Sequence, residues 1–126
     1  MRIGAVDIGT NSVRLLVADV DDEERLRTSH RMGEISRLGE GLDRTGMIDE
    51  SASSRTLECL ERFVHEAEYS GASTIRVAAT NALRVAQNGP DVAARFSDRI
   101  GYPVEILTGE EEARLVFLAV LSGLNP

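Results

Sequence analysis

The sequence has little of what several classes of protein require. Its single cysteine, Cys59, excludes an internal disulfide and a cysteine-based zinc cluster, and its place in an apolar helical pattern predicts a buried thiol. Tryptophan is absent and aromatic residues make up only 4% of the chain, so stacking on nucleic-acid bases has few side chains to use. The net charge of −7 disfavours binding along a nucleic-acid backbone, although backbone amides and a few arginines can still form a small phosphate pocket.

Several functional signatures are missing as well. There is no Walker loop, dinucleotide-binding fingerprint, HExxH zinc motif or GxSxG nucleophile motif. No signal peptide precedes the first apolar run, and no apolar stretch approaches the length that spans a membrane. We therefore expect a cytoplasmic protein with no membrane partner and no nucleic-acid partner. The two histidines, His30 and His65, lack metal-ligand spacing and are predicted to be solvated or partly packed.

The residues that are present predict one α/β domain that begins with a meander of three strands. The 126 residues, 42% apolar and 28% charged, are enough for one globular core. Residues 2–8 and 13–20 are apolar on both alternating faces, which is typical of strands in a sheet covered on both sides. Residues 25–32 follow an acidic turn and are amphipathic, which predicts a third, more exposed strand.

Helices and strands alternate after this meander. The glycine-rich residues 33–48 show no steady period and predict a loop. Beyond it we predict a helix capped by Asp49 and ended by Gly71, then a strand over 73–79. A turn and short helix follow over 80–85, Gly89-Pro90 interrupts this helix, and a further helix that Asp91 caps or starts runs to Ile100. The last two elements are a strand over 104–107 and a final helix that begins at the capping-box pattern Thr108-Gly109-Glu110-Glu111. This order predicts a mixed five-stranded sheet, made of the three-strand meander plus two parallel strands, with helices on both faces. The final helix is apolar enough to be buried or to meet another domain.

The turn between the first two strands, Asp7-Ile8-Gly9-Thr10-Asn11-Ser12, is the strongest candidate for chemistry. Its successive backbone N–H groups and the hydroxyls of Thr10 and Ser12 can converge on one anion, and Gly9 allows the backbone to approach it closely. Asp7 ends the strand, where its carboxylate can hold a metal ion or the water around it. The same residues also suit an ordinary hairpin with side-chain hydrogen bonds, so the turn alone leaves both interpretations open.

Four blocks of sequence carry a resemblance to a known family. The turn at residues 7–12 is similar to the first phosphate motif of the superfamily of actin, heat-shock chaperones and sugar kinases. Its continuation, Val13-Arg14-Leu15-Leu16-Val17-Ala18, resembles the exopolyphosphatase/guanosine pentaphosphate phosphatase family. Three further blocks agree in order and spacing: Arg37-Leu38-Gly39-Glu40-Gly41-Leu42, Ala79-Thr80-Asn81-Ala82-Leu83-Arg84, and Leu107-Thr108-Gly109-Glu110-Glu111-Glu112-Ala113-Arg114-Leu115.

This resemblance covers essentially the whole chain and implies an architecture. The fold would be an actin-like ATPase (ribonuclease H-like) domain, and residues 1–126 would form the N-terminal phosphate-binding domain of a longer protein. A second actin-like domain, opened by a phosphate loop of Asp-x-Gly-Gly-Gly-Ser type, would follow Pro126, because no such loop occurs between Leu115 and Pro126.

The resemblance also implies roles for individual residues. Glu112, directly before Ala-Arg-Leu, matches the family's catalytic base, and Arg84 matches a phosphate-binding arginine. The turn residues Gly9 to Ser12 would bind phosphate, and Asp7 would bind Mg²⁺. Glu110 and Glu111 have an alternative role, since acidic residues in a first helical turn favour the helix dipole. Among the other basic residues, Arg14 and Arg37 are weaker phosphate candidates, and Arg114 is predicted to be structural.

Three functional hypotheses follow. The leading one is a phosphohydrolase that releases terminal phosphate from inorganic polyphosphate, from guanosine pentaphosphate or from both, and that works as a full-length homodimer. The second is a non-catalytic phosphate- or nucleotide-binding module or sensor, since this chain would hold only one wall of the cleft. An ATP-dependent kinase is disfavoured, because kinases of the superfamily share the first phosphate motif but not the Glu-Ala-Arg-Leu block.

Overall fold

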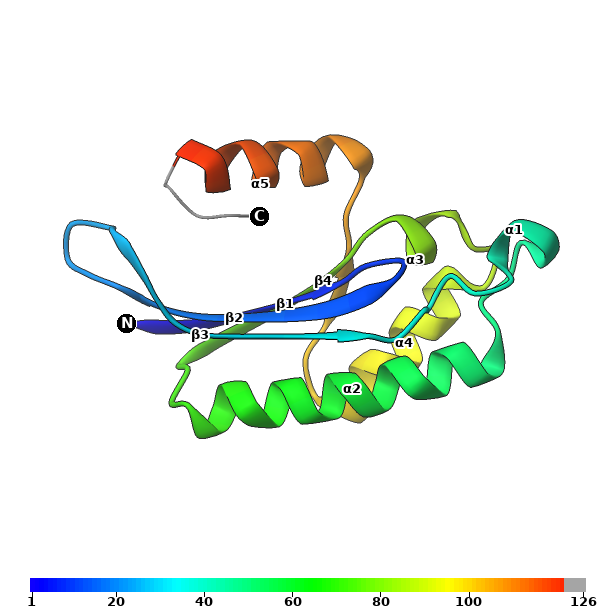
Figure 1. Cartoon of the computed structure of the whole chain (residues 1–126), viewed down its shortest axis with the longest axis horizontal. Coiled ribbons are helices and arrows are strands. Elements are labelled where there is room, and N and C mark those ends of the chain that lie inside the picture. The colour runs from blue at the N-terminus through cyan, green and yellow to red at the C-terminus, as the bar shows by residue number, and fades with distance from the viewer. Residues whose placement is uncertain (122–126) are drawn as a thin grey trace.

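Five strands form one mixed sheet in the order β3-β2-β1-β4-β5 (Figure 1). The first three, β1 (Arg2–Ile8), β2 (Ser12–Val20) and β3 (Leu26–Ile35), form an antiparallel meander. β4 (Thr74–Ala79) pairs in parallel with β1, and β5 (Val104–Ile106) pairs in parallel with β4. The computed structural model describes the backbone of residues 1–121 and the side chains of residues 1–115. The predicted combination of a three-strand meander with two parallel strands is confirmed.

Helices lie on both sides of this sheet, as predicted. α2 (Glu50–Tyr69) and α4 (Gly89–Ile100) lie on one side, and α5 (Gly109–Leu121) lies over the other (Figure 1). Two short helices, α1 (Leu42–Thr45) and α3 (Asn81–Val85), lie at the end of the sheet where the turn between β1 and β2 is found. Within the part of the chain that the structure describes, no helix has both the length and the apolar character needed to span a membrane.

The hydrophobic core lies between the sheet and the helices α2 and α4. Alternate residues of β1 and β2 point into it, because successive side chains of a strand face opposite sides. Its most buried members, none more than 2% exposed, include Val6, Ile8, Val13, Leu15, Val17, Leu60, Phe63 and Phe96. Cys59 is buried among them as predicted, and burial together with nearby Glu34 raises the pKa of its thiol to about 12. The thiol is therefore protonated and unreactive at neutral pH.

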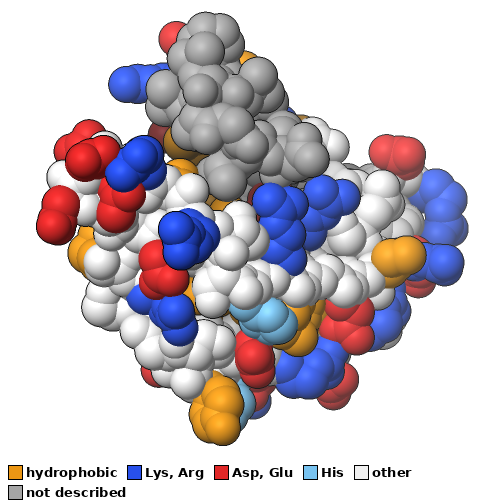
Figure 2. Space-filling view, turned by 60° about the vertical axis from the view of Figure 1, so that its left-hand side comes forward, with side chains coloured by type: hydrophobic (Ala, Val, Ile, Leu, Met, Phe, Trp, Pro, Cys, Tyr) orange, Lys and Arg blue, Asp and Glu red, His pale blue; other side chains and the backbone are white. Residues whose placement is uncertain are grey.

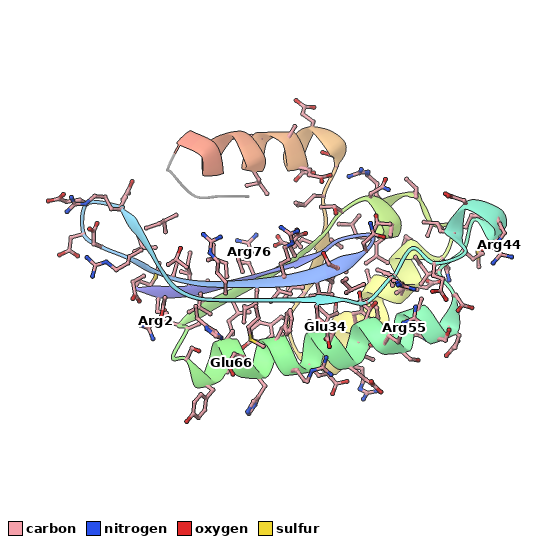
Figure 3. The ribbon with its side chains drawn as sticks, in the orientation of Figure 1. Arg2, Glu34, Arg44, Arg55, Glu66 and Arg76 are labelled. Carbon is pink, nitrogen blue, oxygen red and sulfur yellow. The ribbon has the colours of Figure 1, made fainter. Side chains whose placement is uncertain are left out.

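The opposite side of the sheet, called the open face here, is formed by the other set of alternate residues. Ala5, Asp7, Arg14 and Arg76 are all exposed on it. Figure 3 shows Arg76 on this side, below α5, whereas Glu34 lies on the side of α2. The expectation of strands buried on both faces was therefore too strong. Small residues such as Ala5 count as apolar in a sequence pattern but bury little surface.

Two predicted boundaries are wrong. β3 extends past residue 32 to Ile35, because its pairing with β2 continues to the Ser12–Ile35 pair. The segment predicted as a loop from residue 33 accordingly begins later, and it contains α1. Gly89 and Pro90 begin α4 instead of interrupting the preceding helix. Proline is compatible with this position because the first turn of a helix does not use its N–H groups in intrahelical bonds.

The predicted start of α5 is confirmed in detail. The backbone N–H of Glu111 donates to the Thr108 hydroxyl at 3.1 Å, and the backbone N–H of Thr108 donates to the Glu111 carboxylate at 3.1 Å. These reciprocal bonds satisfy two amides at the beginning of the helix. They also orient the Glu111 side chain toward residue 108, which leaves the next residue, Glu112, to point in a different direction.

The junction between α3 and α4 depends on the absence of a side chain at Gly89. A Cβ atom there would lie 1.9 Å from the carbonyl oxygen of Leu83, a backbone atom that cannot rotate away. Gly89→Ala should therefore lower the free energy of unfolding by about 3 kcal/mol, as measured by urea denaturation. Gly109→Ala is the matched control, because a Cβ atom there meets nothing within 4 Å, and it should change stability by at most about 1 kcal/mol. Equal losses in the two variants would contradict this account.

Candidate active site

Three strands that run in the same direction end at one edge of the sheet. β1 carries Asp7 close to its end, β4 leads into α3 with Arg84, and β5 leads into α5 with Glu112. Ligands of open α/β sheets collect beyond the carboxyl ends of such strands. A cleft of about 710 Å³ lies here between the open face and α5, and Asp7, Thr80 and Glu112 are among the residues that line it.

Arg84 and Glu112 are in direct contact at this edge. Arg84 Nη1 lies 3.3 Å from Glu112 Oε2 and donates a hydrogen bond of 3.0 Å to the Leu107 carbonyl oxygen. The Leu107 carbonyl thereby holds the guanidinium beside the first turn of α5. The two side chains are 31% and 42% exposed, so the ion pair contributes only about 0–1 kcal/mol to stability. An incoming anion can replace Glu112 as the partner of Arg84 at small energetic cost.

Asp7 adds a second carboxylate to the cleft. It keeps some access to solvent, yet partial burial raises the pKa of its carboxyl, and the negative charge of Glu112 raises that pKa further. Arg14, which is the partner of Asp7 in the β1–β2 register, opposes the shift. Two nearby negative charges in a partly desolvated position favour a bound cation or a shared proton.

The β1–β2 turn (residues 9–12) lies beside the cleft, outside the residues that line it. The Gly9 N–H donates to the Ser12 carbonyl oxygen at 2.9 Å, so this amide is used by the hairpin itself. The N–H groups of Thr10 and Asn11 donate to no backbone oxygen within the described chain and are available to an anion. The Asn81 side-chain amide donates a long hydrogen bond of 3.4 Å to the Thr10 hydroxyl. That contact joins the turn to α3, the helix that also carries Arg84.

The remaining sequence candidates divide by position. Arg14 lies on the open face, and Arg37 follows β3 with an exposed side chain. Arg114, predicted to be structural, lines the cleft together with Glu111. Of the three consecutive glutamates, Glu111 and Glu112 line the cleft and Glu110 does not.

Some residues of the cleft were not identified from the sequence. Arg76 and Glu105 form an ion pair of 2.6 Å on its floor, and Thr80 borders it at the end of β4. The alternating pattern of β4 places Arg76 on the face opposite the core, and this alternation is the only sequence feature that could have identified Arg76 as a cleft residue. Asn81 lies in one of the family blocks but carries no role that the sequence alone suggests.

Charge over the rest of the surface is mixed. Figure 2 shows basic and acidic side chains interspersed on one side of the molecule, without a continuous basic stripe. This agrees with the net charge of −7. A phosphate group would therefore be held by local contacts in the cleft and not by a broad positive field.

The sheet order, the helices on both sides and the cleft at the carboxyl ends of parallel strands define an actin-like (ribonuclease H-like) domain. A distant structure, the ethanolamine utilization protein EutJ from Carboxydothermus hydrogenoformans, shares the fold at 12% identity with a TM-score of 0.60, over 93% of this chain and 40% of that one. Within this class the chain belongs to the Ppx/GppA phosphatase family, whose family model matches residues 16–126.

Two curated relatives are named exopolyphosphatases. Exopolyphosphatase 1 of Mycobacterium tuberculosis is 34% identical over 120 residues, which cover 95% of this chain and 35% of the relative. Exopolyphosphatase 2 of the same species is 36% identical over 132 residues, covering 98% and 41%. The crystal structure of the Aquifex aeolicus member of the Ppx/GppA family matches with a TM-score of 0.91 at 31% identity, over 100% of this chain and 41% of that one. The chain thus spans less than half the length of each of these proteins.

The electrostatic coupling of the two carboxylates can be tested directly. Glu112→Gln should lower the pKa of Asp7, because it removes the negative charge that helps to raise it. The pKa is read from a carboxyl ¹³C NMR titration of labelled aspartate. Glu111→Gln is the matched control, since Glu111 lines the same cleft but is not among the groups that shift Asp7. Equal shifts in the two variants would rule out a specific coupling to Glu112.

Proposed function

We propose that the full-length protein that carries this chain is a phosphohydrolase that releases terminal phosphate from inorganic polyphosphate. The observation that carries the proposal is the contact between Arg84 and Glu112 at the carboxyl ends of parallel strands, 3.3 Å apart beside a cleft that also contains Asp7. The names of the two mycobacterial relatives support polyphosphate as the substrate. Guanosine pentaphosphate, which also ends in a phosphoanhydride, is the second substrate to test.

Arg84 is proposed to bind the phosphate that is transferred or released. Its planar guanidinium suits bidentate contact with phosphate oxygens. Nη1 is the one nitrogen of the Arg84 guanidinium that donates hydrogen bonds to the described residues, so Nε and Nη2 are available to a ligand. Binding of phosphate to Arg84 would release Glu112 from the ion pair and leave its carboxylate next to the bound phosphoryl group.

Glu112 is then proposed to orient the attacking water and to accept its proton. General-base help of this kind requires a carboxylate within hydrogen-bond reach of the water. In phosphoryl transfer most of the catalysis comes from positioning and from stabilising negative charge. The Glu112 carboxylate would position the water, while Arg84 and the available amides of the β1–β2 turn would stabilise the negative charge.

Mg²⁺ is the proposed cofactor, and the residues present fit it. Magnesium is commonly held by one or two carboxylates together with water and substrate phosphates. Asp7 lines the cleft and supplies one such carboxylate, and Glu112 is close enough for its charge to raise the pKa of Asp7. Within the described residues no group of three or more acidic, histidine or cysteine side chains could hold a metal ion, so substrate phosphates and water would supply the remaining ligands. When bound, Mg²⁺ would neutralise charge that develops on the phosphate oxygens.

The coverage of the relatives suggests where the rest of the site lies. This chain matches 35–41% of their length, so we propose that a second domain of the full-length protein closes the cleft from the other side. A homodimer and a cytoplasmic location are likewise proposed for that protein.

The role of Glu112 predicts a large loss of activity in the full-length protein. Glu112→Gln should lower kcat for phosphate release from polyphosphate by about 10²–10⁴-fold, because it removes the general base. Glu110→Gln is the matched control, since Glu110 is the neighbouring glutamate on α5 but does not line the cleft, and it should retain kcat within about threefold. Phosphate release is followed with a coupled orthophosphate assay. Equal rates for the Glu112→Gln variant and the unaltered protein would overturn the assigned role.

The proposal also predicts how the 126-residue chain behaves alone. It should bind phosphate weakly at best and show no sustained hydrolysis of polyphosphate, because it supplies one side of the cleft. Calorimetric titration with pyrophosphate and the same phosphate-release assay measure the two properties. Rapid multiple turnover by this chain would show that no second domain is required. Tight phosphate binding by a full-length protein without turnover would favour the sensor hypothesis instead.

A further inference from the structure

A loop that follows β3 is bonded to the β1–β2 turn. This segment, the 36–41 loop, donates two backbone N–H groups, those of Ser36 and Arg37, to the Asn11 carbonyl oxygen at 3.0 Å each. The Gly39 N–H donates to the Thr10 carbonyl oxygen, also at 3.0 Å. Two successive carbonyl groups of the turn are therefore held on the same side, facing the loop.

Holding the carbonyls also orients the amides. The described residues contain no cis peptide bond, and in a trans peptide the N–H of one residue points opposite to the carbonyl of the residue before it. The N–H groups of Asn11 and Ser12 must therefore point away from the 36–41 loop. The loop does not touch a ligand in this arrangement, but it decides which way the candidate phosphate-binding amides face.

The 36–41 loop is itself held firmly. Leu38 is fully buried in the core, and Arg55 of α2 donates to the carbonyl oxygens of Ser36 and Arg37 at 3.1 and 3.3 Å. Figure 3 shows Arg55 between α2 and this part of the chain. Arg37 has a φ of 53°, a left-handed conformation that is unfavourable for a residue other than glycine. Strained residues of this kind persist where the surrounding structure holds them, and they are frequent near functional sites.

Gly39 lies against Thr10 of the turn, with no room for a side chain between them. A Cβ atom at Gly39 would lie 2.5 Å from the Thr10 methyl carbon, Cγ2, and no other atom would be closer than 3.5 Å. Gly39 does not have a positive φ, so its backbone conformation accepts alanine. The methyl group of Thr10 is thus the one obstacle to a side chain at this position. Rotating that methyl away would also rotate the Thr10 hydroxyl, which accepts the hydrogen bond from Asn81.

We propose that the 36–41 loop positions the β1–β2 turn for phosphate, and that Gly39 is a positioning residue that acts through Thr10. The inference rests on the proposed function for its phosphate, although the contact between loop and turn does not. A side chain at residue 39 has two ways to fit. Either the turn moves as a unit and its amides are displaced, or Thr10 rotates and its hydroxyl leaves Asn81.

The test is a double-mutant cycle in the full-length protein, with phosphate release from polyphosphate as the assay. Gly39→Ala should lower kcat/KM by about tenfold or more, since sub-ångström displacement of a positioning group is costly. Thr10→Ser removes Cγ2 and keeps the hydroxyl, so the clash disappears. Gly39→Ala introduced into the Thr10→Ser background should therefore change kcat/KM by less than about twofold relative to Thr10→Ser alone. A general loss of stability would not be rescued in this residue-specific way.

Gly33→Ala serves as the matched glycine control. A Cβ atom at Gly33 would have its nearest neighbour, the Val13 carbonyl oxygen, at 3.9 Å, so kcat/KM should stay within about twofold of the unaltered protein. An unchanged kcat/KM in Gly39→Ala, or the same loss in both Thr10 backgrounds, overturns the proposal. If Gly39→Ala alone fails to fold, the double variant is compared with Thr10→Ser. A double variant that also fails to fold overturns the proposal.

A second readout separates this inference from the proposed function. The backbone amide signals of Asn11 and Ser12 in a ¹H–¹⁵N correlation spectrum should shift in Gly39→Ala and return toward the Thr10→Ser positions in the double variant. If the unaltered full-length protein releases no phosphate, the proposed hydrolase function fails. The amide shifts then still test whether the 36–41 loop sets the geometry of the turn, and unshifted signals would refute it.

Discussion

The parallel pairing of β1 with β4, and of β4 with β5, determines where the candidate site residues lie. Asp7, Arg84 and Glu112 are far apart in the sequence, yet each sits at or just beyond the carboxyl end of one of these strands. An antiparallel β4 would carry Arg84 to the opposite edge of the sheet. The cleft, the Arg84–Glu112 contact and the raised pKa of Asp7 all depend on this shared direction.

The two faces of the sheet separate stability from chemistry. Large aliphatic side chains of β1 and β2 pack against α2 and α4 and form the core. The alternate residues carry charge, as Asp7, Arg14 and Arg76 show, and they meet a cleft below α5. Because strand residues alternate, substitutions on the open face can alter binding without opening the core. The 36–41 loop links the two functions, since Leu38 is anchored in the core while its neighbours hold the β1–β2 turn.

Much of the fold could be predicted from the sequence, and the errors have physical causes. The buried Cys59 and the Thr108–Glu111 capping box were predicted correctly because each depends on local pattern, and the mixed sheet was predicted correctly from the order of strands and helices along the chain. The end of β3 was not, because Ile35 is held in the strand by pairing with a distant residue, Ser12. Proline at residue 90 was taken as an interruption, although Pro90 suits the first turn of α4.

The site shows the same division. By itself the sequence determined the candidate residues: the hydroxyl and amide groups of the turn indicated Thr10 and Asn11, and the resemblance to family motifs indicated Arg84 and Glu112. Only the tertiary structure decided which of them meet. It brought Arg84 into contact with Glu112 and placed Gly39 against the methyl group of Thr10. Contacts of this kind arise from strand direction and from packing between segments distant in sequence, which no local pattern of residues encodes.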